Sequence, residues 1–325
     1  MVMKKIVLSI VLLCSFSVGA QQQNNFSMWQ STGSWLNAGA TAIMFQEYSF
    51  FANYRSQYLT SAAIPNRTNL FVAEAKAFEG KISNGWIGTG LHFVNDETGI
   101  GSTKLATNSA YVPFNYVAQL QEKTFVGVGF KPGFINRSLV TDFQTWDNQW
   151  NGIAFDQYIP DNELSARKFT VFDMSAGLFF QTTTYGEHEF KFGVAANHIT
   201  SPDVRFTTVT DQLFRQYVFH GKAAFKLERY RFKLAPQFTS FIQGPITYHQ
   251  VGASLDITIR EGSRRTLFVQ DKFFGIGMHY RTDNTLVTAL ILELEGFTIG
   301  AAFDADLGEA STATSGALAA EGFIK

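Results

Sequence analysis

The sequence has almost no cysteine, little charge, and no long apolar run after its first 20 residues. Cys14 is the only cysteine and lies in the opening segment, so the rest of the chain forms no disulfide. Charged residues make up 16% of the chain, whereas soluble domains carry roughly 25%. No later apolar stretch approaches the roughly 18 residues expected of a membrane-spanning helix. The formal net charge of −1 gives no indication of nucleic-acid binding or of an anionic membrane surface as partner.

The first 20 residues have the pattern of a secretory signal peptide. Two lysines are followed by about a dozen mostly apolar residues, and small residues at Val18 and Ala20 suit cleavage before Gln21. Cys14 follows Leu13 rather than a small residue, which argues against a lipoprotein anchor. We therefore expect residues 1–20 to be removed and the remaining chain of 305 residues (325 less 20) to be exported.

What the sequence has in abundance is phenylalanine, with 33 residues, and glycine, with 27, in segments that alternate apolar and polar residues. In 229–239, one face of a strand would carry Tyr230, Phe232, Leu234 and Phe238. The other face would carry Arg231, Lys233, Gln237 and Thr239. One such segment fits a soluble amphipathic strand, but the pattern recurs along the chain. Because a membrane protein without spanning helices must close its sheet, the repetition favours a transmembrane barrel.

We therefore expect an all-β fold, a transmembrane antiparallel β-barrel of about 14 strands in the outer membrane, formed by 41–325. The strands are expected near 41–54, 67–78, 84–95, 105–118, 123–137, 170–181, 187–199, 216–228, 229–242, 248–260, 271–281, 284–295, 296–305 and 316–324. Long connections are expected at 55–66, 96–104, 138–169 and 200–215. Long loops outside and short turns in the periplasm are typical of outer-membrane barrels. A soluble secreted β-sandwich rich in aromatic residues is the alternative.

Three segments lie outside the expected strands. Residues 21–40 are either a disordered leader in the periplasm or a segment that folds into the barrel mouth or lumen. The segment 308–316 is small and polar, which is typical of a loop. The long connection 138–169 is too aromatic for a solvated tether and is expected to fold over or bind something. Its aromatic residues are Trp146, Trp150, Phe155 and Tyr158.

The sequence gives no signal for catalysis, and we expect neither catalytic residues nor a cofactor. The six histidines are scattered and show no HExxH spacing. His220 and His249 could meet in the lumen, although ordinary polar lumen histidines are the better interpretation. No serine stands in a GxSxG turn. A Ser/His/carboxylate site assembled in space is the alternative that remains, since triads are not recognised by sequence position.

The segment 95–101 is rich in acidic residues and glycine, and we expect it to be an extracellular turn. Asp96 and Glu97 resemble calcium ligands superficially, but the segment lacks the alternating ligands and terminal Glu of an EF-hand. The same holds for 161–163, so we expect no metal site. The charges expected in the lumen are of both signs, namely Glu189, Lys191, Lys222, Lys226, Arg231 and Lys233. They would either tune a pore or pair across a filled interior.

The order of several motifs resembles the PorP/SprF family of Bacteroidota outer-membrane proteins, which belong to the type IX secretion and gliding-motility system. The motifs are FFANYRSQY at 50–58, GTGLHFVNDETG at 88–99, FVGVGFKPGFINRS at 125–138, FDMSAGLF at 172–179 and GVAANHITSP at 193–202. The resemblance runs from near Phe26 to the C-terminus. One departure is the sequence LNAGA at 36–40, where the family usually has an NPAxAG motif.

The resemblance implies a non-enzymatic barrel that acts through partners. One branch of the family is a core secretion component associated with periplasmic ring proteins. Another supports the secretion or surface anchoring of a particular adhesin through its C-terminal secretion signal. We favour the adhesin branch for this chain, with outer-membrane lipid around the barrel and no nucleic-acid partner. Partner contacts are expected from Trp146, Trp150 and Tyr158 of the aromatic loop and from Asp96 and Glu97, because interface anchors are often aromatic. The alternative function is a diffusion porin or solute channel; an outer-membrane enzyme comes third.

Overall fold

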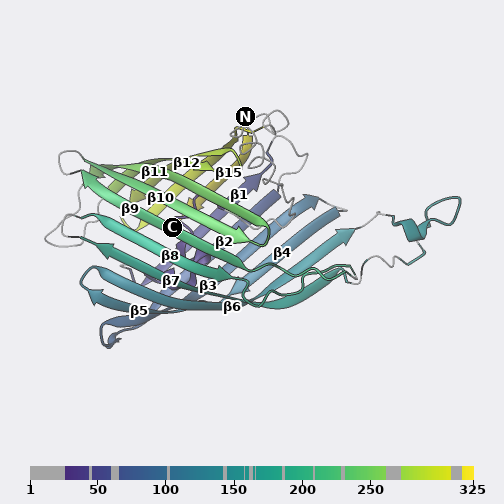
Figure 1. Ribbon diagram of the computed structural model, residues 1–325, viewed down its shortest axis with the longest axis horizontal. Helices are drawn as coiled ribbons and strands as arrows, with labels where there is room; N and C mark the ends of the chain where they lie inside the picture. Colours follow the sequence, from purple (N-terminus) through teal and green to yellow (C-terminus); the bar gives the residue numbers. More distant parts are fainter. Residues whose placement is uncertain are drawn as a thin grey trace, which may run out of the picture.

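The computed structural model describes most of the chain after residue 25 (Figure 1). The described residues are 26–43, 46–59, 66–100, 103–141, 145–156, 158–160, 164, 166–184, 187–207, 209–227, 231–260, 272–308 and 317–325. The signal peptide expected at 1–20 lies outside them, as do residues 161–163 and most of 308–316.

The described strands form one closed antiparallel barrel. Apart from β4 and β5, each strand pairs with its neighbours in the chain, and β1 also pairs with β15, which closes the sheet. The strands are β1 (Tyr48–Gln57), β2 (Asn66–Ile82), β3 (Gly85–Ile100), β4 (Thr103–Tyr111), β5 (Phe114–Gln121), β6 (Thr124–Thr141), β7 (Lys168–Thr183), β8 (Glu189–Asn197), β9 (Gln216–Leu227), β10 (Phe232–Gln243), β11 (Ile246–Arg260), β12 (Lys272–Arg281), β13 (Thr285–Leu294), β14 (Phe297–Asp306) and β15 (Ala317–Ile324). Closure leaves no unpaired edge in the membrane, as a spanning sheet requires.

Two of these elements, β4 and β5, share one position in the barrel. Both pair with β3 on one side and with β6 on the other. The interruption falls at Val112 and Pro113, where proline has no N–H to donate to a neighbouring strand. Fifteen described elements therefore occupy fourteen strand positions, and the expected 14-stranded barrel is confirmed.

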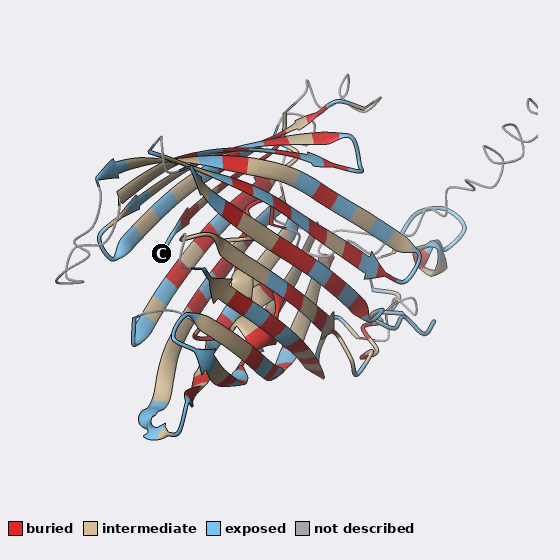
Figure 2. Cartoon of the chain, turned by 60° about the vertical axis from the view of Figure 1, so that its left-hand side comes forward, coloured by how far each residue is buried: buried red, intermediate tan, exposed pale blue. Residues whose placement is uncertain are grey.

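Side chains alternate between the lumen and the outer surface, as the pleat of a strand requires. On β3, His92 and Val94 are buried inside, whereas Leu91 and Phe93 are exposed outside. Figure 2 shows this alternation as bands of buried and exposed residues along the strands. The outward apolar side chains form the belt that faces lipid hydrocarbon.

The connections differ at the two ends of the barrel. One end carries the long connections 58–65, 142–167 and 198–215, and the other carries the turns 83–84, 122–123 and 295–296. The first is therefore the extracellular end and the second the periplasmic end. One expected long loop, 96–104, is wrong: β3 runs to Ile100 and β4 begins at Thr103. The cause is that β2 and β6 extend equally far and pair with these residues.

The helical elements of the described chain are short. They are α2 (Gly33–Leu36), η1 (Ala38–Ala40) and η2 (Asp147–Gln149). Among the described residues, no helix has the length and apolar character needed to cross a membrane.

Candidate functional site

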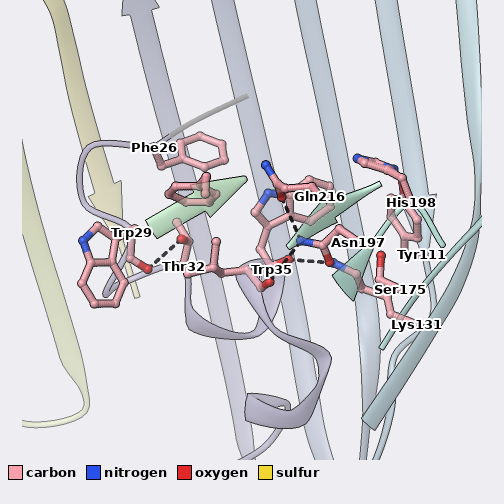
Figure 3. A pocket seen from close by; sticks show the side chains of 12 residues that line it. Phe26, Trp29, Thr32, Trp35, Tyr111, Lys131, Ser175, Asn197, His198 and Gln216 are labelled. Atoms are coloured by element: carbon pink, nitrogen blue, oxygen red, sulfur yellow. Dashed lines mark hydrogen bonds between the residues drawn. The ribbon is translucent and has the colours of Figure 1, made fainter. Parts of the chain in front are cut away.

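Residues 26–43 lie inside the barrel, and we call this segment the lumen plug. It consists of turns followed by α2 and η1. Phe26, Met28 and Leu36 of the plug are buried, because the barrel wall surrounds them. Figure 3 shows plug residues Phe26, Trp29 and Trp35 lining one pocket together with wall residues such as Asn197 and Lys131. The plug thus lies across the space through which a solute would have to pass.

A buried ion cluster holds the N-terminal end of the plug. Ser27 donates from its backbone N to Glu321 Oε2 at 2.7 Å and from its hydroxyl to Asp304 Oδ2 at 2.7 Å. Arg55 donates to Ser27 Oγ at 2.6 Å and pairs with Asp304 at 2.9 Å and Glu321 at 3.0 Å. Arg281 adds a second cation, 3.2 Å from Asp304. Two arginines balance two carboxylates, which offsets the several kcal/mol that burying each ion alone would cost.

The apolar side chains of the plug complete two hydrophobic clusters of the wall. The first cluster joins Phe26 and Met28 to Phe51, Leu70, Val72, Val94, Val287, Ala289, Ala302 and Phe323. The second joins Trp29 and Leu36 to Ala195, Val218 and Phe241. These wall residues lie on β1, β2, β3, β8, β9, β10, β13, β14 and β15. Because both clusters are completed by plug residues, burial of apolar surface favours the plugged state.

A glycine-lined part of the wall receives the middle of the plug. A Cβ on Gly129 would lie 2.4 Å from Ala38 O, and one on Gly127 would lie 2.0 Å from Gly39 O. On the plug side, a Cβ on Gly39 would meet Gly177 O at 2.7 Å. Contacts under 3.0 Å are essentially never seen for real Cβ atoms. The plug backbone therefore approaches the wall this closely only because glycine stands on both sides.

Asn37 is the central polar anchor of the plug. Its Nδ2 donates to Leu178 O at 2.9 Å and lies 3.1 Å from His220 Nε2, while its Oδ1 accepts from Gly39 N at 2.9 Å. The amide thus joins β7 and β9 to the turn η1. Asn37 is fully buried, and a buried amide needs hydrogen-bond partners for both its donors and its acceptor. These bonds fix the position of the 36–40 segment that departs from the family motif.

Wall side chains also hold the C-terminal end of the plug. Trp86 Nε1 donates to Ala42 O at 3.0 Å, and Glu74 Oε2 accepts from Ala42 N at 3.1 Å. Asn115 Nδ2 donates to Gly39 O at 2.9 Å and to Thr41 O at 2.8 Å. Backbone groups at the end of η1 and just after it are therefore satisfied by side chains of β2, β3 and β5, as buried backbone requires.

A hollow lies between plug and wall, lined by Trp35 and Lys131 and, where β8 ends and β9 begins, by Asn197 and Gln216 (Figure 3). Lys131 crosses it: its Nζ donates to Trp35 O at 2.7 Å and lies 4.4 Å from the centre of the Trp35 ring. Trp35 also meets Tyr111 edge to face at 5.6 Å. A cation on an aromatic face is stabilised most where water is displaced. Lys131 is therefore a plug anchor, with its charge directed to the plug.

The buried carboxylate Asp173 connects the wall to the loop between β8 and β9. It accepts from Tyr111 OH at 2.7 Å and from Thr200 Oγ1 at 3.1 Å, and it pairs with His198 Nδ1 at 2.7 Å. Tyr111 belongs to β4, whereas His198 and Thr200 follow β8. This network holds the start of the loop against the rim of the barrel.

The aromatic loop residues lie far from the plug, on the connection between β6 and β7 (Figure 1). Trp150 and Phe155 form an isolated bridge with their rings 5.1 Å apart, and Trp146 is the N-cap residue that precedes η2. Ile153 and Tyr158 are 88% and 96% exposed. The structure therefore brings these residues to one exposed tip and gives them no contact with the lumen.

The turn expected at 95–101 is wrong, because Asp96 and Glu97 lie within β3. Asp96 faces the barrel interior and accepts from Thr68 Oγ1 at 2.6 Å. Glu97 faces outward and pairs with Lys104 at 2.8 Å. The two residues stand on opposite faces of one strand, so they do not form a joint surface, and neither lies beside the aromatic loop tip.

The histidines do not form a cluster. His220 faces the lumen beside Asn37, as the favoured interpretation of a polar lumen histidine requires, whereas His249 is exposed on β11, so the alternative in which the two meet in the lumen is wrong. Within the described residues, no group of three or more His, Cys, Asp or Glu side chains could hold a metal ion. The lumen charges pair in part with neighbours, as Lys191 does with Glu189 at 2.8 Å.

Sequence reasoning did not find the plug anchors. The feature of the sequence that could have indicated them is the presence of small residues at 38–40 together with inward-facing glycines on the strands, such as Gly127 and Gly129. Arg55 and Lys131 stand in the motifs at 50–58 and 125–138, but nothing local to those motifs indicates that their side chains reach the N-terminal segment.

The fold and the lumen define the class of this protein: an outer-membrane β-barrel with a self-plugged interior. The chain is similar to several solved barrels. One is the CymD monoaromatic hydrocarbon channel, with 12% sequence identity and a TM-score of 0.48 over 94% of this chain and 92% of that chain. A second is a deltaS2 mutant of the TodX monoaromatic hydrocarbon channel, with 10% identity and a TM-score of 0.40 over 89% of this chain and 90% of that chain. A third is the translocator domain of autotransporter NalP from Neisseria meningitidis, with 10% identity and a TM-score of 0.36 over 85% of each chain. No curated protein matches the chain significantly.

The profile of one family, described as "Type IX secretion system membrane protein PorP/SprF", matches residues 18–319. The match covers nearly the whole chain. The protein therefore belongs to the PorP/SprF family of type IX secretion system membrane proteins.

Proposed function

We propose that this chain is a non-enzymatic outer-membrane component of type IX secretion that supports the secretion or surface anchoring of a partner adhesin. The observation that carries the proposal is the plug. A barrel whose lumen is crossed by its own buried segment is suited to present surfaces rather than to pass solutes. A diffusion channel, by contrast, needs a water-filled path.

The surface that fits this role is the exposed aromatic tip of the β6–β7 loop. Trp150, Ile153 and Tyr158 leave large apolar area exposed at the extracellular end. A water-exposed cluster of this kind is typical of a protein-binding site. The partner class proposed is a large secreted adhesin, bound directly or through its C-terminal secretion signal, with periplasmic ring proteins as partners at the other end.

The test is a crosslinking pull-down from outer membranes of the native host, followed by mass spectrometry. Wild-type protein should recover a large secreted adhesin, and the triple variant Trp150→Ser, Ile153→Ser, Tyr158→Ser should lose it. The matched control is Val209→Ser with Leu307→Ser, which removes two exposed apolar residues at the same end. Recovery of ring proteins alone would favour the core translocon role instead.

The structure also shows which residues of the β6–β7 loop can be deleted without removing strand residues. Residues 138–141 belong to β6 and Lys168 begins β7, so deleting 138–168 would remove paired strand residues. Replacement of 145–160 by a short Gly/Ser linker leaves all strand pairs intact. Adhesin display at wild-type level after this replacement would contradict the proposal.

The diffusion porin makes an opposite prediction for planar bilayers. The full chain should show little conductance if the plug stays in place. Steady, large conductance of the wild-type protein would favour the porin.

A further inference from the structure

Four asparagines form a continuous row across the outer surface of the barrel. Asn69, Asn95, Asn108 and Asn136 are direct partners on β2, β3, β4 and β6, and Thr170 continues the row on β7. Asn69 Nδ2 lies 3.3 Å from Asn95 Oδ1, Asn95 Nδ2 lies 2.9 Å from Asn108 Oδ1, and Asn136 Nδ2 lies 2.8 Å from Thr170 Oγ1. Thr68, Leu70, Val94, Ser109 and Ile135, which flank the asparagines in sequence, are buried in the interior, so the asparagine row faces outward.

A row of outward residues, all phenylalanine except for one alanine, lies directly below the asparagines. It is formed by the outward residues two positions closer to the membrane centre on the same strands: Phe71, Phe93, Ala110, Phe134 and Phe172. These phenylalanines are exposed, and Phe134 meets Phe172 edge to face at 5.7 Å. On β6 the outward residues from Val126 to Phe134 are apolar, a length of about 26 Å along the strand. The change from Phe134 to Asn136 therefore marks the outer limit of the hydrocarbon.

A third row, one step further out, carries charge. Arg67 and Lys168 are exposed at the two sides of this surface, and Lys104 and Glu97 pair between them. Three cations thus accompany one carboxylate. Four strand spacings separate β2 from β7, so the rows are roughly 19 Å wide. The order outward from the membrane is aromatic, amide, cationic.

We propose that this surface binds an anionic glycolipid of the outer leaflet. Acyl chains lie against the phenylalanine row, sugar hydroxyls bond to the asparagine row, and phosphates meet Arg67, Lys104 and Lys168. Each amide has two N–H donors and an oxygen with two lone pairs, so bonds along the row use only part of its capacity. Charge-assisted bonds from Arg and Lys to phosphate are among the strong ones. The site is independent of the proposed adhesin partner.

A hydroxyl-rich headgroup fits this order better than a simple phospholipid. A small phosphodiester could use the cations but would leave the wide amide row without a matching partner. The row also stands on strands that continue beyond the hydrocarbon, to Ile100 on β3 and Thr141 on β6. The pairing of these strands holds the polar groups at headgroup level, which favours binding without a large ordering cost.

The experiment is native mass spectrometry of the full-length protein purified in detergent and titrated with lipopolysaccharide or with phosphatidylglycerol. Wild type should bind lipopolysaccharide at least 10-fold more tightly. Asn95→Thr with Asn108→Thr, which removes two amides but suits a strand, should abolish that preference. Arg67→Glu with Lys168→Glu should weaken lipopolysaccharide binding at least 10-fold.

The matched control is Lys81→Glu with Lys123→Glu, the same charge change at the periplasmic end of the same side, which should bind as wild type. Folding of each variant is checked by the change of its gel mobility on heating, which folded barrels show. If the asparagine variant does not fold, the charge variants still test the proposal. Equal binding of the two lipids by wild type, or unchanged lipopolysaccharide binding by folded asparagine and charge variants, would overturn the proposal. Loss in the Lys81/Lys123 control as well would also overturn it, by showing that total charge alone decides.

Discussion

Arg55 on β1 donates a hydrogen bond of 2.6 Å to the hydroxyl of Ser27, and the same guanidinium pairs with Asp304 and Glu321. One wall residue thus links the start of the plug to the strands β14 and β15. Because β1 and β15 close the barrel, plug docking and barrel closure are coupled at this point.

Replacing Arg55 by alanine should release the N-terminal end of the plug. Asp304 and Glu321 would be left buried with less compensation, and breaking one partner of a buried pair costs about 3–5 kcal/mol. We expect a lower thermal transition and faster proteolysis of 26–36 in detergent. Arg205→Ala, which breaks an exposed pair with Asp203, should change neither. Equal protease resistance of Arg55→Ala and wild type would contradict the role of the cluster.

Two glycines of the plug should respond differently to alanine. A Cβ on Gly39 meets wall backbone at 2.7 Å, whereas a Cβ on Gly33 meets nothing within 4 Å. Gly39→Ala should destabilise docking by about 1–3 kcal/mol through overpacking. Gly33→Ala lies in α2 and should be neutral or stabilising by up to ~1 kcal/mol. Chemical denaturation monitored by Trp fluorescence compares them, and similar curves for both variants would refute the close fit.

Deleting 26–43 should convert the barrel into a conducting pore. The strand pairs close the sheet without the plug, and the inward Lys191, Lys222 and Glu189 would then meet water. Planar-bilayer recordings should show conductance well above that of the full chain. The Gly33→Ala variant is the control for nonspecific leakage. A deletion variant that folds and still does not conduct would show that other parts of the chain block the lumen.

Asp173→Ala should loosen the loop between β8 and β9. The change removes the acceptor shared by Tyr111, His198 and Thr200, and each unsatisfied buried group costs about 1–3 kcal/mol. Faster hydrogen exchange at 198–207 is expected, with little change in β10 to β13. Asp203→Ala, a change at a partly exposed residue of the same loop that pairs with Arg205, serves as the comparison. Unaltered exchange in Asp173→Ala would mean that other contacts hold the loop.

Features of the fold were predictable where a short stretch of sequence carries the pattern that causes them. The alternation in 229–239 is local, and it correctly predicted which residues of β10 face the lumen, such as Gln237 and Thr239. The segment 95–101 misled because polar residues and glycine are typical of turns. There the strands extend beyond the hydrocarbon, where their outward face meets water and needs no apolar residues.

By itself, the sequence determined the barrel, its strand positions and most of its long loops, because a pleated strand between lipid and lumen requires a local alternation of apolar and polar residues. Only the tertiary structure decided what fills the interior. Ser27 and its acceptor Glu321 are 294 residues apart in the chain, and no periodicity reports such a contact. Plug docking depends instead on ion pairs, inward glycines and buried amides that meet once the sheet has closed.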